Sequence, residues 1–208
     1  MRYESFAYLF PPRPDQAISP TMLPMVERQG YIAQVKKNGT CNVIAVSPTG
    51  EVKCMSRHKE DHKAWKPDQS KLKAFSRLAG RGWYVFVAEL MHSKVAGIRD
   101  INYVHDILVH NGDYLVGKTQ GQRQALLREV FPTAGLPETH SHYVYDEYTW
   151  IAKEYHEGFF GLYKGLDDGQ DEGLVMKNPK QPLAFCTREK SNNVGLLKAR
   201  KTHKNYSF

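Results

Sequence analysis

The sequence has few cysteines and no long apolar run. Its three cysteines, Cys41, Cys54 and Cys186, are an odd number without C-x-x-C spacing, so neither a disulfide framework nor a cysteine zinc site is predicted. No segment approaches the roughly 20 apolar residues of a membrane-spanning helix, and the N-terminus lacks a signal-peptide pattern. We therefore expect a soluble, cytoplasmic protein with no membrane partner.

The charge balance favours one class of partner. Lys and Arg number 29 against 22 Asp and Glu, which gives a formal charge of +7 and a pI near 9.2. An excess of positive charge favours polyanionic partners such as nucleic acid. With 41% hydrophobic residues in 208, the chain has enough apolar material for one core, and we expect a single domain over residues 1–208.

Most of the regular structure is expected to be β. Segments rich in β-branched and aromatic residues, bounded by turn formers such as Asn38-Gly39, predict strands. The predicted strands are Tyr31–Val35, Cys41–Val46, Glu51–Met55, Trp83–Leu90, Tyr103–Val109, Gly173–Lys177 and Val194–Arg200. Residues 1–24, which are rich in proline, are expected to form an extended lead-in before regular structure begins.

Apolar residues at helical spacing predict three helices. These are Ser70–Ala79, Thr119–Phe131 and Asp146–Leu166. Thr119 and Gln122 form a capping pair at the start of the second. In the third, apolar residues recur every three or four positions from Ile151 to Leu162, as an amphipathic helix requires. The whole pattern predicts an α+β fold in which antiparallel sheets are flanked by helices.

A lysine stands at an informative place. Lys36 follows the first predicted strand and precedes the Asn38-Gly39 turn. An ordinary lysine, with a pKa of about 10.4, is protonated at neutral pH, so a nucleophilic lysine needs burial or a neighbouring cation. Lys37, Lys177 and Lys198 are candidate neighbours. Taken alone, Lys36 fits a surface lysine in a hairpin better than a nucleophile.

Short sequence motifs elsewhere in the chain argue against a surface lysine at position 36. In chain order they are Lys36-Lys37-Asn38-Gly39, Ser56-Arg57, Val87-Ala88-Glu89-Leu90, Tyr103-Val104-His105-Asp106-Ile107-Leu108, the Arg123 to Leu127 segment, Glu172-Gly173-Leu174-Val175-Met176-Lys177 and Leu197-Lys198-Ala199-Arg200. Their order resembles the motifs of the covalent nucleotidyltransferase superfamily, which contains ATP-dependent DNA ligases, RNA ligases and mRNA capping enzymes. The resemblance is to the adenylation domain of small phage-type ATP-dependent DNA ligases or of RNA ligases, with an ATP-grasp-like fold around a nucleotide cleft.

The resemblance implies a polynucleotide ligase that uses ATP and Mg²⁺, with Mn²⁺ as a substitute. Lys36 attacks the α-phosphate of ATP, AMP passes to a 5′-phosphate end, and a 3′-hydroxyl displaces AMP. Lys177 and Lys198 are then expected to face the α-phosphate as catalytic cations. Glu172 is expected to hold the metal, and Glu89 to hold the ribose hydroxyls or assist the metal.

The remaining residues implied by the resemblance contact the nucleoside or the nucleic acid. Gln34 is expected to contact adenine, and His105 to stack on its ring. Arg57 is expected to bind the ribose or the 5′-phosphate of the nucleic acid, and Arg200 and Lys201 to contact the polynucleotide.

Several features depart from the pattern. Cys41 replaces an arginine of DNA ligases and capping enzymes, and Leu196 replaces a tryptophan. Nicked DNA is the favoured substrate, in repair or replication, with RNA as the alternative and a GTP-dependent capping enzyme after it. Relatives continue into an OB-fold domain beyond the point that corresponds to Phe208, so we expect a monomer that self-adenylylates weakly or a partner that supplies that domain. If the protein is phage-encoded, it is expected in the host cytoplasm.

Other patterns compete with this interpretation. Gly112–Thr119 satisfies the phosphate-loop spacing G-x-x-x-x-G-K-[ST], although Asn111-Gly112 favours a hairpin there. His58 and His62, and His140 and His142, have spacings that zinc ligands use, but without an evident third ligand polar loops explain them better. The remaining alternative is a non-catalytic module that binds nucleic acid through the basic C-terminal run Lys198, Arg200, Lys201 and Lys204.

Overall fold

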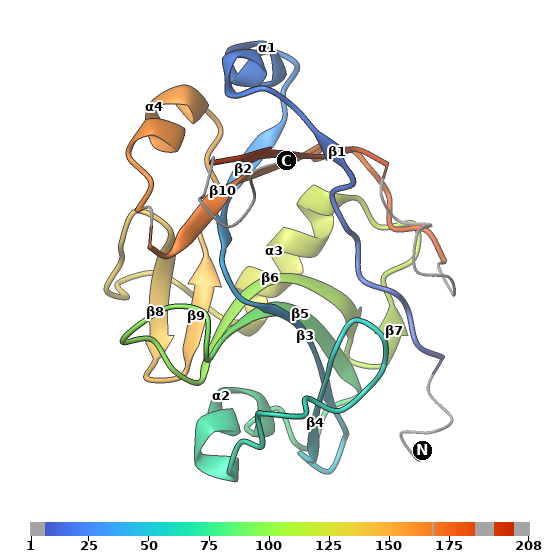
Figure 1. Cartoon of the computed structure of the whole chain (residues 1–208). Helices are drawn as coiled ribbons and strands as arrows, with labels where there is room; N and C mark the ends of the chain where they lie inside the picture. Colours follow the sequence, from blue (N-terminus) through green and yellow to red (C-terminus); the bar gives the residue numbers. More distant parts are fainter. Residues whose placement is uncertain (1–6, 168, 186–193, 202–208) are drawn as a thin grey trace.

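The fold consists of two β-sheets with short helices at their faces (Figure 1). The computed structural model describes residues 7–167, 169–185 and 194–201. Cys186 and the end of the basic C-terminal run at Lys204 lie outside these residues. The small sheet has the order β1-β11-β10-β2. It contains β1 (Gln16–Ala17), β2 (Ile32–Lys37), β10 (Asp171–Lys177) and β11 (Leu196–Arg200).

The large sheet has the order β4-β3-β5-β6-β9-β8, with β7 paired to β6. Its strands are β3 (Thr40–Val46), β4 (Val52–Met55), β5 (Tyr84–Met91), β6 (Ile101–His110), β7 (Asp113–Tyr114), β8 (His142–Asp146) and β9 (Thr149–Ala152). The helices are α1 (Leu23–Arg28), α2 (Lys73–Ser76), α3 (Gln120–Val130) and α4 (Phe159–Lys164), with 3-10 turns η2 (Pro20–Met22) and η3 (Gln69–Leu72).

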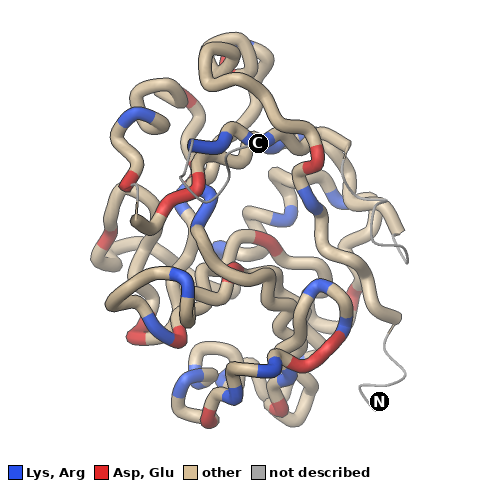
Figure 2. Tube along the Cα trace, in the orientation of Figure 1, with Lys and Arg blue, Asp and Glu red and all other residues tan. Residues whose placement is uncertain are grey.

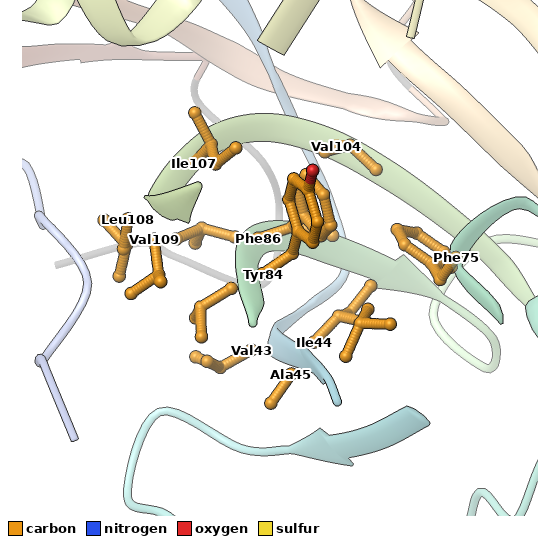
Figure 3. Packing of buried hydrophobic residues seen from close by; sticks show 14 of the residues in the cluster. Val43, Ile44, Ala45, Phe75, Tyr84, Phe86, Val104, Ile107, Leu108 and Val109 are labelled. Carbon is orange, nitrogen blue, oxygen red and sulfur yellow. The ribbon is translucent and has the colours of Figure 1, made fainter. Parts of the chain in front are cut away.

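Each sheet has its own apolar core. On the large sheet, Ile44 and Phe86 pack with Phe75 from α2, as Figure 3 shows, and all three are fully buried. On the helix-covered face of the small sheet, Leu174 packs with Leu23 from α1 and Phe159 from α4. Because side chains alternate along a strand, these cores leave the opposite face of the small sheet to polar residues.

Most predicted strands and the helix at α3 are confirmed. Thr119 caps α3 and forms a reciprocal capping box with Gln122. The predicted α+β class is also found, but the sheets are mixed because β1 pairs with β11 and β6 pairs with β9 in parallel. The helix expected over Ser70–Ala79 is shorter, since a 3-10 turn takes its first residues.

The predicted helix over Asp146–Leu166 is wrong. That segment contains β9 and the short α4, separated by Gly158 with a φ of 74°. The apolar spacing arose because Ile151 enters the core of the large sheet, whereas Phe159 and Leu162 pack under the small sheet. The apolar residues of two separate segments thus happen to have the spacing of one amphipathic helix.

The N-terminal lead-in also differs from its prediction. Within residues 7–24 the chain forms β1 and η2, and α1 begins at Leu23. Regular structure therefore begins earlier than expected. The longest helix in the described ranges, α3, has 11 residues, and no helix there is long and apolar enough to cross a bilayer.

Candidate active site

The polar face of the small sheet brings together side chains from three strands. The register pairs Lys36 with Gly173 and Gly173 with Arg200, and in the neighbouring row it pairs Gln34 with Val175 and Val175 with Lys198. Residues two apart on a strand share a face. All these residues except Gly173 line one cavity of about 190 Å³, and Lys177 also lines it.

The large sheet supplies the other wall of the cavity. Cys41, Glu89 and Tyr103 are aligned across β3, β5 and β6, and all three line the cavity together with His105 and Arg57. The seven residues expected to bind nucleotide therefore face one space. They are Gln34, Lys36, Arg57, Glu89, His105, Lys177 and Lys198.

A β-bulge places Glu172 against Lys36, which lines the cavity. The pairing of β10 with β2 shifts between Asp171 and Gly173, so Glu172 is the unpaired extra residue. Its carboxylate contacts the amine of Lys36, and Arg200 Nε lies 3.7 Å from the same oxygen. The Lys36 side chain is 19% exposed and that of Glu172 is 8% exposed. The lysine is thus a cavity residue, not the surface lysine of a hairpin.

Gly173 is required by the close approach of β11. Its φ is +146°, and a Cβ atom there would lie 1.9 Å from the carbonyl oxygen of Ala199. Other residues rarely adopt this backbone conformation. The glycine of the string Glu172-Gly173 therefore has a physical reason, because it lets β11 pair next to the bulge.

Gly39 has a similar role on the opposite wall. A Cβ atom at Gly39 would lie 2.6 Å from Glu89 Cγ and 2.6 Å from the Leu90 carbonyl oxygen. Its N–H donates to Glu89 Oε1 at 3.1 Å. Burial raises the pKa of Glu89, and the Glu172 carboxylate adds to this rise while Lys36 opposes it. The turn after Lys36 therefore fixes the carboxylate of Glu89, which lines the cavity.

Lys177 lies at the end of the cavity that Gln34 and His105 form. Its Nζ donates to the His105 carbonyl oxygen at 3.1 Å, and Gln124 Nε2 donates to the same oxygen at 2.9 Å. Gln34 Nε2 lies 3.5 Å from Gln124 Oε1. Burial lowers the pKa of Lys177 and, with the charge of Lys177, lowers that of His105 to about 3. The imidazole is therefore neutral at physiological pH.

Asp106 and Arg123 hold α3 against this end of the cavity. Arg123 Nε and Nη2 donate to the two oxygens of Asp106 at 3.0 and 2.9 Å, with both side chains 3% exposed. Burial raises the pKa of Asp106, but Arg123 outweighs it and the net direction is down. Bidentate arginine–carboxylate pairs fix geometry well. The motif residues Asp106 and Arg123 therefore position α3 against this end of the cavity.

Sequence reasoning missed a buried charge cluster beside the bulge. Lys37 Nζ lies 2.7 Å from Asp171 Oδ1, and both side chains are 0% exposed. His140 Nε2 lies 2.8 Å from the other oxygen of Asp171. Lys37 and Asp171 directly adjoin Lys36 and Glu172, so their ion pair ties together the strand ends that carry Lys36 and Glu172. The signal available was a second lysine and a second acid next to the motif residues.

Lys201 lies off the cavity. Alternation along β11 directs Lys198 and Arg200 to the cavity and the residues between and after them to the other face. Lys201 Nζ accordingly donates to the carbonyl oxygen of Leu166, which belongs to the helix-covered core. Of the residues expected to contact nucleic acid, Arg57 and Arg200 therefore border the cavity and Lys201 does not.

Comparison with known proteins gives a fold relationship. No protein-family model and no curated protein matches the sequence. The mycobacterial DNA ligase D complexed with ATP and MES matches with a TM-score of 0.59 at 18% identity, over 94% of this chain and 61% of that chain. The ATP-dependent DNA ligase from bacteriophage T7 in complex with ATP matches with a TM-score of 0.52 at 18% identity, over 89% and 67%. The chain has the fold of ATP-dependent DNA ligases.

A third DNA ligase, Lig E, matches with a TM-score of 0.53 at 9% identity, over 83% of this chain and 62% of that chain. The predicted resemblance to the nucleotidyltransferase domains of ligases is thus confirmed at the level of fold. The chain spans about three fifths of the mycobacterial ligase and two thirds of the phage ligase.

The ligase fold also accounts for the phosphate-loop spacing. Asn111 and Gly112 have positive φ values of 51° and 92° and turn β6 into β7. The N–H groups of Gly117 and Gln120 donate to the carbonyl oxygens of Leu183 and Gln181. A phosphate loop directs such N–H groups at the anion, so Gly112–Thr119 is a hairpin and helix start of the ligase fold.

The histidine pairs occupy loops and a strand. His58 is exposed after β4, and His62 Nε2 lies 3.0 Å from Asn42 Oδ1. His142 opens β8 and stacks on Trp150 with ring centroids 3.9 Å apart. Within the described ranges no cluster of three or more His, Cys, Asp or Glu residues could hold a metal ion.

Two histidines are expected to make the fold sensitive to acid. Burial lowers the pKa of His105 to about 3 and that of His142 to about 4. In the unfolded chain a histidine binds a proton near pH 6.5, so the stability that each neutral ring contributes is present above about pH 6.5 and is lost as the pH falls towards the folded value. At pH 5 each of the two histidines is expected to lower the free energy of unfolding by up to about 2 kcal/mol relative to pH 7. Urea unfolding at pH 7 and pH 5 measures the loss.

The matched variants are His142→Asn and, as a control, His156→Asn, since His156 is exposed. His142→Asn should reduce the difference in unfolding free energy between the two pH values, and His156→Asn should leave it unchanged. An equal difference in wild type and His142→Asn would contradict the assignment.

Proposed function

We propose that this chain is an ATP-dependent polynucleotide ligase domain that works through a lysyl-AMP intermediate on Lys36. The observation that supports this most is the position of Lys36 in the cavity of a ligase fold, against Glu172 and next to a row that carries Lys198. A lysine, a carboxylate and several cations around one cavity, with a second carboxylate against the lysine, suit phosphoryl transfer, which depends on alignment and charge balance.

The nucleotide would lie with adenine at the Gln34 and His105 end of the cavity. A neutral His105 ring suits stacking on a base, and Glu89 would take the ribose hydroxyls. The strand register separates the two lysines expected at the α-phosphate. Lys177 pairs with Ile32, which is four residues and roughly 13 Å along β2 from Lys36. Lys198 is closer, because it is only two residues along β11 from Arg200, the residue in register with Lys36. We therefore assign Lys198 to the α-phosphate and Lys177 to the base end.

The two carboxylates fit a magnesium ion. Glu172 and Glu89 offer oxygen ligands, which a hard cation prefers, and Mg²⁺ usually takes one or two carboxylates together with water and phosphate. Burial raises the pKa of Glu89, although Lys36 opposes the rise and Glu172 adds to it, and a bound cation would favour the ionised form of both carboxylates. When bound, the ion would balance negative charge on the phosphates.

The residues of this chain have separate tasks in the proposed reaction. Lys36 Nζ must lose a proton before it attacks, and the Glu172 carboxylate is the acceptor that lies against it. Lys198 would balance charge that develops on the α-phosphate. Arg57 and Arg200, at the edge of the cavity, would bind the phosphate end of the polynucleotide, with Lys201 further out.

DNA is the proposed substrate, and RNA is the alternative. The DNA interpretation rests on the resemblance of the segment from Val104 through the Arg123 helix to small phage ligases. Cys41 favours the alternative, because the arginine of DNA ligases is absent at that position. Sealing assays on nicked DNA, nicked RNA and hybrid duplexes discriminate between them, and sealing of RNA strands alone would overturn the DNA assignment.

Intact-mass spectrometry tests the function itself. After incubation with ATP and Mg²⁺, the protein should gain the mass of one AMP, and peptide mapping should place it on Lys36. Incubation with GTP should give no adduct, whereas a GMP adduct would indicate a capping-type enzyme. Absence of any adduct under both conditions would reject the ligase proposal and leave a non-catalytic nucleic-acid-binding module.

A further inference from the structure

A proline-rich strap crosses from one sheet to the other beside the cavity. We define the strap as residues 9–17. At one end Leu9, which is 3% exposed, is buried in the core of the large sheet. At the other end Gln16 and Ala17 pair in parallel with Leu197 and Lys198 of β11. Figure 1 shows this segment running from near the N-terminus to β1. Because both ends are attached, the middle of the strap has a defined place.

The middle of the strap forms part of the cavity wall. Pro12, Arg13 and Pro14 line the cavity. Arg57 Nη1 donates to the Pro11 carbonyl oxygen at 3.0 Å, and Lys198 Nζ donates to the Pro14 carbonyl oxygen at 3.0 Å. The strap therefore holds two cations that the proposed function assigns to phosphate groups, Lys198 on β11 and Arg57 in the turn after β4.

Arg13 adds a cation on this side of the cavity. Its Nε lies 3.6 Å from Asp15 Oδ1, and both side chains are nearly half exposed (45% and 49%), so this ion pair contributes little energy. Burial first, then the charges of Arg200 and Arg13, lower the pKa of Lys198, and Lys36 has a smaller effect in the same direction. Lys198 is thus within electrostatic reach of both the strap cation and the nucleophile. Arg13 is the one basic residue of the strap, and Figure 2 shows further basic positions on the strands beside it.

We propose that Arg13 is a further phosphate-binding residue, which the strap places to hold the outer phosphates of the nucleotide. This inference rests on the proposed function. It concerns the group that leaves when the bond from Lys36 Nζ to the α-phosphorus forms and the bond to the bridging oxygen breaks, with the electron pair going to pyrophosphate.

The geometry of the reaction gives Arg13 this task. In phosphoryl transfer the attacking and leaving atoms are roughly in line, so the leaving pyrophosphate lies across the α-phosphate from the nucleophile. Lys36 lies on β2 in the small sheet, and Lys198, which we assign to the α-phosphate, lies on β11 two strands away. The strap is attached beyond β11, on the side away from β2. An arginine there faces the outer phosphates, which it can bind with two N–H groups.

The test compares Arg13→Ala with wild type in formation of the AMP adduct. The ATP concentration for half-maximal adduct formation should rise roughly tenfold or more, as for loss of a hydrogen bond to a charged group. Added pyrophosphate should discharge the preformed adduct less readily by a similar factor, because the same contact binds pyrophosphate in reverse. Transfer of AMP from the preformed adduct to nicked nucleic acid should change less than about twofold. Arg13→Lys should recover part of the loss.

The matched control is Arg28→Ala, an exposed arginine on α1 that does not line the cavity. It should leave ATP and pyrophosphate dependence unchanged. If Arg13→Ala forms the adduct with the ATP dependence of wild type, this inference fails while the proposed function stands. A defect confined to AMP transfer would assign Arg13 to the phosphate of the polynucleotide and would also overturn the inference. If wild type forms no adduct, both proposals fail.

Discussion

Replacement of Lys36 by alanine is expected to abolish the AMP adduct while the protein stays folded. Loss of a catalytic nucleophile costs on the order of 10⁶ in rate in well-studied enzymes. The Lys36 side chain is 19% exposed, and Arg200 Nε lies 3.7 Å from the Glu172 oxygen that the lysine contacts. The Glu172 carboxylate therefore keeps a cation nearby, and we expect the unfolding free energy to change by less than about 1 kcal/mol. Intact mass and urea unfolding measure the two effects.

Two further variants separate chemistry from charge. Lys36→Arg keeps a positive charge against Glu172, but a guanidinium stays protonated and does not act as a nucleophile, so it should form no adduct. Lys53→Ala, at an exposed position on β4, should form the adduct at the wild-type rate. Because the last proposed step needs no lysine attack, Lys36→Ala should still seal a nick whose 5′ end already carries AMP. Adduct formation by Lys36→Ala or Lys36→Arg would place the nucleophile elsewhere.

The strands that carry the candidate site were predictable because local signals and tertiary structure agree there. β-branched runs bounded by Asn38-Gly39 give β2 and β3 their positions, and the register of β2 with β10 follows from which side chains must be buried. From the sequence, Gly173 could be recognised only as part of the Glu172-Gly173 motif, without a structural reason for the glycine. Its physical cause, the approach of the Ala199 carbonyl oxygen, depends on a strand pairing that no local pattern specifies.

The elements that sequence reasoning missed depend on long-range packing. β9 pairs in parallel with β6, nearly fifty residues earlier in the chain, so the local spacing from Ile151 to Leu162 could not reveal which apolar side chains enter which core. The strap was expected only as an extended lead-in. Proline restricts its backbone, but its place beside the cavity comes from Leu9 in one core and from pairing of Gln16 with β11.

The buried pair of Lys37 and Asp171 shows why charge next to a motif is hard to interpret from sequence. A lysine after the proposed nucleophile and an acid before the proposed metal-binding carboxylate both look like solvated residues. In the structure, alternation along β2 directs Lys37 away from Lys36, into the space where Asp171 and the Tyr103 ring lie. Two charges without solvent exposure are tolerated there because each meets the other.

Removal of one member of this pair is expected to be costly. Lys37→Met leaves Asp171 buried with His140 as its ionisable neighbour, and Asp171→Leu leaves the Lys37 ammonium buried without its carboxylate. Each variant should lower the free energy of unfolding by about 3–5 kcal/mol, because an uncompensated charge then stays in the interior. Urea unfolding at pH 7 measures the loss, and Lys53→Met at an exposed position is the control that should show none.

The double variant Lys37→Met/Asp171→Leu tests the physical reason. Apolar replacement of a buried ion pair is often neutral or stabilising, so the double variant should be much more stable than either single variant. It should not fully reach wild type, because Asp171 Oδ2 also accepts the N–H of Asp167 at 3.1 Å, and leucine leaves that donor unpaired. Losses that simply add in the double variant would show that Lys37 and Asp171 contribute independently. A recovery would show that the loss in each single variant comes from the uncompensated buried charge, because an apolar pair then joins the strand ends of Lys36 and Glu172 nearly as well as the ion pair does.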